Sequence, residues 1–150
     1  MRIVIVNDHA RIVGGAAKIA ILSARALAER GHRVDFFAAT GPVAPELAGL
    51  EVTCLGIEPH TENPSRLRGA LQGIWYRPAA RALRALLAQC DPRDTVVHFH
   101  AYRDALTASV ADAAQRAGFV CVYTAHEYSM GCPYQGFFDY RRNEICHLRG

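Results

Sequence analysis

Lysine is almost absent from this sequence of 150 residues, because all but one of its seventeen basic side chains are arginines and Lys18 is the exception. The net charge is only +3, and no run of basic residues is dense. Nucleic-acid-binding surfaces are usually strongly basic, so we expect no nucleic-acid partner. The excess of arginine over lysine, together with abundant alanine, is typical of a GC-rich bacterial genome.

Long hydrophobic runs are also missing. No apolar stretch approaches the ~18 residues that a membrane-spanning helix needs. The first apolar run, Ile3 to Val6, stops at Asn7 and Asp8 and is too short for the hydrophobic region of a signal peptide. We therefore expect a cytoplasmic protein, whose contact with the inner membrane, if any, is peripheral.

Cysteine is sparse and odd in number, with five in the chain. Such cysteines are typical of small apolar side chains in a reducing compartment. Cys132 and Cys146, with His147 beside the second, lack the close Cys-x-x-Cys pair of a structural zinc site, and their role stays open. His98 and His100 form a His-x-His pair without an evident third ligand. We expect no metal ion and no cofactor.

Two familiar nucleotide-binding motifs are absent. The glycine fingerprint for dinucleotides requires G-x-G-x-x-G in a tight turn directly after a strand, whereas here a long linker precedes two adjacent glycines. Lys18 does not stand in a phosphate-binding Walker A loop either. Asp35 has about the right spacing for a ribose-binding acid, but it stands near the start of its predicted strand, where we expect it to be solvated.

Short β-branched runs alternate with segments of helical spacing, and this alternation is the main structural signal. Strands are predicted over 2–6, 33–39, 51–57, 94–99 and 119–124, and helices over 15–30, 66–90 (divided at Pro78) and 103–117. The residues after Ala125 are predicted to form a loop. The pattern is typical of an α/β protein: a Rossmann-like parallel sheet with helices on both faces, in one domain over 1–150.

Gly14 and Gly15 stand where the first predicted helix begins, after the first strand. A helix N-terminus at that edge of a parallel sheet presents unpaired N–H groups, and glycine lets an anion approach them. We predict a cradle for a phosphate or diphosphate. The alternative is that the glycines only form the junction between a loop and a helix and bind no ligand.

The last predicted strand ends in Thr124-Ala125-His126-Glu127. The carboxyl ends of parallel strands meet at one edge, so His126 is predicted to lie near the glycine pair, where an imidazole can donate a hydrogen bond or move a proton. A structural histidine bonded to a neighbouring loop is the alternative. Further candidates for lining a cleft near this edge are His9, Arg11, His100, Glu127 and Tyr128. The alternative for Tyr128 is that its ring packs its own loop down.

The stretch from Arg66 to Arg84 mixes arginines with leucines and with the only tryptophan, Trp75. Such a helix can lie on an anionic membrane. A solvated helix whose apolar face packs on the core would have a similar sequence, and both interpretations stay open.

Three stretches together resemble the N-terminal domain of glycosyltransferase family 4: VGGAAKIAILSARALAERGHRVDFF, DTVVHFHAY and VYTAHEYSMGCPYQGFFDY. The resemblance covers essentially the whole chain. It implies the GT-B architecture, in which two Rossmann-like domains face each other across a cleft. Glu127 stands where many relatives have aspartate.

The resemblance also implies roles and a reaction. Gly14 and Gly15 would approach the diphosphate of a nucleotide-sugar donor, and His126 would lie at the sugar, near the reacting carbon. The reaction would be a retaining transfer of the hexosyl type to a saccharide or a lipid-linked acceptor, without an obligatory metal.

In that family the second domain holds most of the donor contacts, and no such domain lies within 1–150. The resemblance therefore implies that the chain is the N-terminal part of a longer enzyme, inactive on its own. Two other functions stay open: a nicotinamide-dependent oxidoreductase with a degenerate nucleotide loop, and a non-catalytic binding module.

Overall fold

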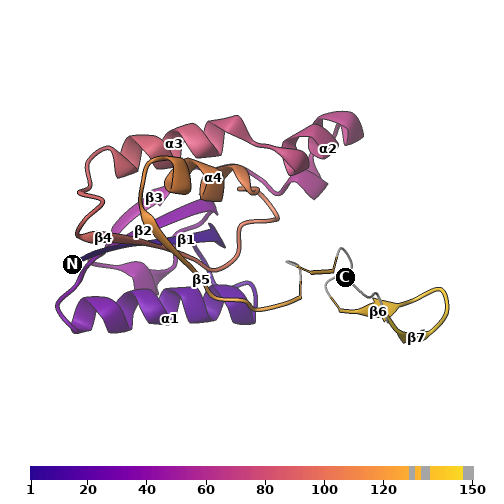
Figure 1. Ribbon diagram of the computed structural model, residues 1–150, viewed down its shortest axis with the longest axis horizontal. Helices are drawn as coiled ribbons and strands as arrows, with labels where there is room; N and C mark the ends of the chain where they lie inside the picture. The colour runs from indigo at the N-terminus through magenta and orange to yellow at the C-terminus, as the bar shows by residue number, and fades with distance from the viewer. Residues whose placement is uncertain (129–130, 133–135, 147–150) are drawn as a thin grey trace.

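A computed structural model describes residues 1–128, 131–132 and 136–146. Five parallel strands form one twisted sheet in the order β3-β2-β1-β4-β5. Helix α1 lies on one face of this sheet, and α3 and α4 lie on the other (Figure 1). The alternating pattern thus predicted the fold class correctly: it is an α/β, Rossmann-like sheet.

The central strand, β1 (Arg2–His9), pairs with β2 (Arg33–Thr40) on one side and with β4 (Thr95–Phe99) on the other. Its alternate side chains enter two separate cores. Ile3 and Ile5 pack in the core under α1, whereas Val4 and Val6 pack in the core under α3 and α4. A parallel strand buried on both faces has no polar side, which is why it reads as a continuous apolar run.

The predicted end of β1 at Val6 is wrong, because the strand continues through Asn7 and Asp8 to His9. Asn7 and Asp8 are buried despite being polar. Burial of such groups is tolerated when hydrogen bonds satisfy them, and these two residues make long-range bonds that form the floor of the site described below.

Helix α1 (Gly15–Glu29) agrees with the prediction to within one residue. It is followed by Gly31, whose φ of 85° lies in the left-handed region that favours glycine. Ala17, Ala20, Ile21 and Ala24 form its buried face, over β1 and β2.

On the other side of β2, the predicted third strand is confirmed as the short edge strand β3 (Glu51–Cys54), which ends before Ile57. The 3-10 turns η1 (Pro45–Leu47) and η2 (His60–Glu62) flank it in sequence. The predicted break in the following helical stretch is confirmed: α2 (Arg66–Ile74) and α3 (Arg77–Leu87) are separate helices, and Pro78 lies in the first turn of α3, where proline is well tolerated.

The predicted helix over 103–117 begins too early. Helix α4 spans only Ser109–Arg116, and β5 (Val120–Tyr123) follows it. The backbone N–H groups of residues 104–106 donate to the carboxylate of Asp8 instead of entering a helix. Thr107 has a φ of 66°, in the left-handed region, which also interrupts a helix.

The prediction that Asp35 is solvated is wrong. Its carboxylate is buried and forms a bidentate ion pair with Arg2, at 2.7 Å to Nε and 2.6 Å to Nη2. The hydrogen bond with Asp35 raises the pKa of Arg2. Both residues lie toward the amino ends of their strands, away from the candidate site.

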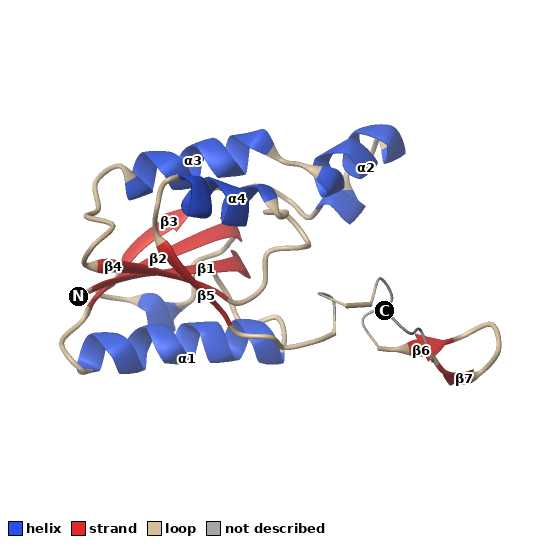
Figure 2. Cartoon of the chain, in the orientation of Figure 1, coloured by secondary structure: helices blue, strands red, loops and turns tan. Residues whose placement is uncertain are grey.

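The segment after β5 leaves the sheet (Figure 2). It was predicted to be loop, but it contains a small antiparallel hairpin of β6 (Phe138–Asp139) and β7 (Glu144–Ile145). All five cysteines are free thiols, and Cys132 in this segment is buried while the others are half-buried. Among the described residues, no helix has the length and apolar character needed to cross a bilayer.

Candidate active site at the carboxyl edge of the sheet

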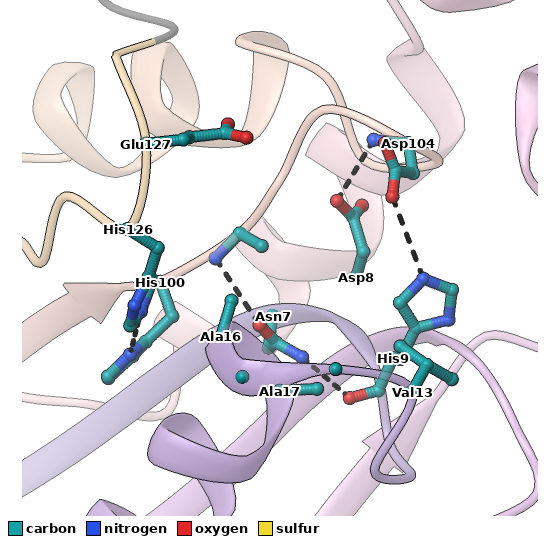
Figure 3. Close-up of a pocket in the computed structure, with 13 residues that line it drawn as sticks. Asn7, Asp8, His9, Val13, Ala16, Ala17, His100, Asp104, His126 and Glu127 are labelled. Atoms are coloured by element: carbon teal, nitrogen blue, oxygen red, sulfur yellow. Dashed lines mark hydrogen bonds and ion pairs between the residues drawn. The ribbon is translucent and has the colours of Figure 1, made fainter. Parts of the chain in front are cut away.

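A cavity of about 250 Å³ lies where β1 and β4 end, between the N-terminus of α1 and the segment that follows β5 (Figure 3). In an open parallel sheet, ligands bind at this edge. The cavity brings together residues that are far apart in the sequence. Its lining consists of Asn7, Asp8, His9, Val13, Gly14, Gly15, Ala16, Ala17, His100, Ala101, Asp104, His126 and Glu127.

The N-terminus of α1 is open toward this cavity. Gly14 is the N-cap and has no side-chain cap, and no acidic residue stands in the first turn. The N–H of Lys18 donates the first hydrogen bond of the helix, to the carbonyl of Gly14 at 3.0 Å. The preceding N–H groups, of Gly15, Ala16 and Ala17, have no acceptor among the described residues. Together with the helix dipole, they attract an anion.

Neither glycine is required by the backbone or by the protein's own packing. Gly14 is extended, with a φ of 178°, and a Cβ added at Gly14 or Gly15 would meet no described atom within 4 Å. The space in front of the amides is therefore open. A larger side chain at Gly15 would reach into that space without displacing part of the protein.

Three histidines form a row beside the helix terminus. His98 lies in β4 and His100 directly follows that strand, with their ring centroids 4.3 Å apart. His100 Nδ1 lies 3.0 Å from His126 Nε2, and the two rings are stacked (Figure 3). At the other end of the row, His98 Nε2 lies 2.7 Å from the hydroxyl of Thr124.

Burial controls the charge of this row. His100 is almost fully buried, and burial, with the neighbouring imidazoles of His98 and His126 adding to it, lowers the pKa of His100 to about 4. Burial also lowers the pKa of His98. Because desolvation disfavours the imidazolium form, His100 is neutral at physiological pH.

The loop after β4 is held by two buried side chains of β1. The Asp8 carboxylate accepts hydrogen bonds from the N–H groups of Asp104, Ala105 and Leu106 at 2.9–3.0 Å. The side-chain amide of Asn7 donates to the carbonyl of His9 at 2.7 Å, and its Oδ1 accepts from the backbone N–H of Ala101. Burial raises the pKa of Asp8, although the three amides act in the opposite direction. Asn7 and Asp8 thereby build the floor of the cavity.

A sequence profile described as Glycosyltransferase Family 4 matches residues 13–146. The chain belongs to glycosyltransferase family 4. It is therefore a glycosyltransferase domain, which implies a sugar donor and an acceptor as substrates in general terms. The match gives no support to a nicotinamide-dependent oxidoreductase or to a non-catalytic module. The comparisons with curated proteins and with solved structures give no match.

The structure of this glycosyltransferase domain places most of the predicted site residues in one cavity. Gly14, Gly15, His126, His100 and Glu127 all line it. His9 lines it too, with its Nε2 3.7 Å from a carboxylate oxygen of Asp104. Near the opposite wall, the carboxylate of Glu127 lies 3.8 Å from the guanidinium group of Arg103.

Two predicted residues lie elsewhere. Arg11 is exposed, and its Nε donates to the carbonyl of Gly41 at 3.1 Å. Tyr128 is exposed and packs edge-on against Phe137, with ring centroids 5.2 Å apart. Neither side chain lines the cavity of the transferase domain.

The cysteines in the segment after β5 help to hold its backbone. The thiol of Cys132 accepts from the N–H of Phe137 at 3.3 Å, and the N–H of Cys146 donates to the carbonyl of Phe137 at 2.6 Å. His147 lies outside the described residues. Within the described part of the chain, no three histidine, cysteine or acidic side chains gather in a way that could hold a metal ion.

Sequence reasoning about the family 4 domain missed Asn7, Asp8 and Asp104 as site residues. A signal for the first two was present, because polar residues directly after a buried apolar run lie at the ligand-binding edge of a parallel sheet. Asp104 gave no such signal, since it stands inside a segment predicted to be helical.

Proposed function

We propose that this domain is the acceptor-side half of a retaining glycosyltransferase that uses a nucleotide-sugar donor. The observation that carries the proposal is the cavity itself, where an uncapped helix N-terminus lined by two glycines faces an imidazole across one small space. A departing diphosphate needs preorganised hydrogen-bond donors, and the N–H groups of Gly15, Ala16 and Ala17 fulfil that need.

In the proposed reaction, the bond between the anomeric carbon and the diphosphate oxygen breaks, and its electron pair leaves with the diphosphate. The acceptor hydroxyl oxygen then bonds to the same face of that carbon, and its proton leaves with the diphosphate. The amides at the start of α1 stabilise the charge that develops on the leaving group, because donors fixed in a cavity need no reorganisation.

His126 is proposed to lie beside the transferred sugar. His100 Nε2 is buried and has no described partner, so its single proton is best placed on Nδ1, where His126 Nε2 accepts it. His126 then carries its own proton on Nδ1, as a donor to a sugar oxygen. His100 is thus a positioning residue that sets the tautomer and the ring orientation of His126.

The acceptor is proposed to be a saccharide or a lipid-linked sugar that enters beside His9, Asp104 and Glu127. His9 ends β1, whereas Asp104 and Glu127 lie on the segments that follow β4 and β5, and all three line the cavity. Arg11 and Tyr128 lie outside the cavity and could contact only a more extended acceptor. We further propose a hexosyl donor and a second domain, absent from 1–150, that supplies most of the donor contacts. The domain alone would then be inactive.

Substitution at Gly15 tests the cradle. In the full-length enzyme, Gly15→Ala should weaken binding of a nucleotide-sugar probe such as UDP-glucose or GDP-mannose, and Gly15→Val should weaken it further, because the side chain fills the space before the amides. Ala26→Val, at an exposed position near the other end of α1, controls for the general effect of a β-branched residue on the helix. Titration calorimetry and turnover report the result. Unchanged binding in Gly15→Val would remove the cradle from the proposal.

A further inference from the structure

Helix α2 has its apolar stripe on the outside of the protein. Leu67, Leu71 and Ile74 recur at the spacing that places them on one face of a helix, and they are 72%, 60% and 71% exposed. In an ordinary surface helix this stripe packs on the core. The alternative of an apolar face packed on the core is therefore wrong for α2, whereas it holds for α3, whose Leu83 and Leu87 are buried in the core.

Glycines occupy the inner face of α2 and hold it in this orientation. A Cβ on Gly69 would come within 2.5 Å of the carbonyl oxygen of His60, and a Cβ on Gly73 within 2.8 Å of the His60 ring. The backbone of α2 therefore sits directly on η2. Turning the helix to bury its leucines would break this close packing.

The charged side chains of α2 and α3 have one sign, and Glu62 on the neighbouring η2 is the nearest acidic residue before them in the sequence. Residues 65–89 contain no aspartate or glutamate but have five arginines. Arg66 and Arg68 flank the leucine stripe, and Arg77, Arg81 and Arg84 form an exposed row along α3. Among the described residues, none of these five guanidinium groups forms an ion pair with a carboxylate.

Trp75 joins the two helices of this surface. It is 44% exposed and lines a hollow together with the arginine row of α3. The hollow also contains Asp112, whose carboxylate is already engaged by Arg116 at 2.7 Å. An exposed tryptophan between apolar and cationic side chains is typical of a segment lying at a membrane interface.

We propose that α2 and the start of α3 dock the protein on an anionic lipid bilayer. The leucine stripe enters the boundary between headgroups and acyl chains, Trp75 lies at the headgroup level, and the arginines bind lipid phosphates. Charge complementarity favours an anionic bilayer over a second copy of the chain on this surface. A second copy of the chain would bring two uncompensated arginine clusters together, whereas an anionic membrane neutralises them.

The placement of α2 suits this role. Figures 1 and 2 show it projecting beyond the N-terminal end of α3, on the side of the molecule toward which the strands of the sheet point. The inference itself is independent of the proposed reaction, since lipid binding requires neither donor nor acceptor. If the transferase proposal also holds, the bilayer lies on the side where a lipid-linked acceptor would enter.

Sedimentation of the full-length protein with vesicles tests the proposal. The protein should bind vesicles containing phosphatidylglycerol, should not bind phosphatidylcholine vesicles, and should be released by salt. Where Trp75 is the only tryptophan of the protein used, a blue shift of its emission reports insertion. Leu67→Ser with Leu71→Ser should lower the partition coefficient by about tenfold or more, and each of Arg77→Gln and Arg81→Gln should lower it by about fivefold.

The control uses exposed residues on the opposite face of the sheet. Ile19 and Leu22 on α1 are each 46% exposed, and Ile19→Ser with Leu22→Ser should leave vesicle binding unchanged. An unchanged thermal midpoint shows that each variant folds. The proposal is overturned if the wild-type protein does not bind anionic vesicles, if salt does not release it, or if the control loses as much binding as the leucine variant. It is also overturned if the leucine substitutions abolish self-association instead of vesicle binding.

Discussion

His100 should make the stability of this protein acid-sensitive, and the variant His100→Gln should remove the part of the acid loss that this residue causes. Burial holds the pKa of His100 at about 4 in the folded protein, against about 6.5 for an unfolded chain. The unfolded state therefore binds more protons between these two values. By linkage, the free energy of unfolding falls as the pH drops from about 6.5 toward 4.

The size of the effect follows from the shift. One pKa unit corresponds to about 1.4 kcal/mol, so acidification from pH 7 to pH 4.5 should cost the wild-type protein about 2–3 kcal/mol through this residue. Glutamine does not titrate, so the variant should lack this part of the acid loss. A domain of this kind is stable by about 5–15 kcal/mol, which makes the difference easy to measure.

Urea unfolding of both proteins at the two pH values gives the comparison, and the histidine signals in an NMR titration give the pKa directly. His32→Gln, in the turn before β2, serves as the control and should keep the acid-dependent loss of the wild type. A His100 midpoint near 6.5, or the same acid loss in wild type and His100→Gln, would refute the assignment of a neutral, buried imidazole that orients His126.

Three further predictions concern the site and the surface helix. His126→Ala in the full-length enzyme should lower kcat by about 100-fold while donor affinity by calorimetry stays nearly the same; a loss of affinity alone would contradict a role in the chemical step. Asp8→Ala should lower the free energy of unfolding by about 3–5 kcal/mol, because the backbone amides after β4 lose their acceptor. A loss below about 1 kcal/mol in urea unfolding would contradict the role of Asp8 in holding the loop after β4. Gly69→Ala should loosen α2 by pushing its backbone off His60, so its amides should exchange hydrogen faster; unchanged exchange would show that the close packing is unimportant.

The architecture was predictable because its signals are local. Buried strands read as short β-branched runs, and helices read as apolar residues at helical spacing. The errors came from contacts between residues distant in sequence. The start of α4 depends on Asp8, about a hundred positions away, and the burial of Asp35 depends on Arg2, 33 positions away.

The candidate site was predictable in part for a topological reason. Glycines before a helix and a histidine after a strand must come to one edge of a parallel sheet, so Gly14, Gly15 and His126 were expected together, and one cavity contains all three. The 3.0 Å contact between His100 and His126 was not predictable, because the distance between two neighbouring strand ends depends on how their loops pack.

The amino-acid sequence by itself determined the order of strands and helices, the parallel sheet and the edge at which chemistry can occur, because periodicity and strand direction are local properties of a chain. Tertiary structure alone decided which polar groups are buried and which way the stripe of α2 faces. Leu67, Leu71 and Ile74 have the same spacing whether they face the core or the solvent. Close packing of two glycines on His60 turns them outward, and no local pattern contains that contact.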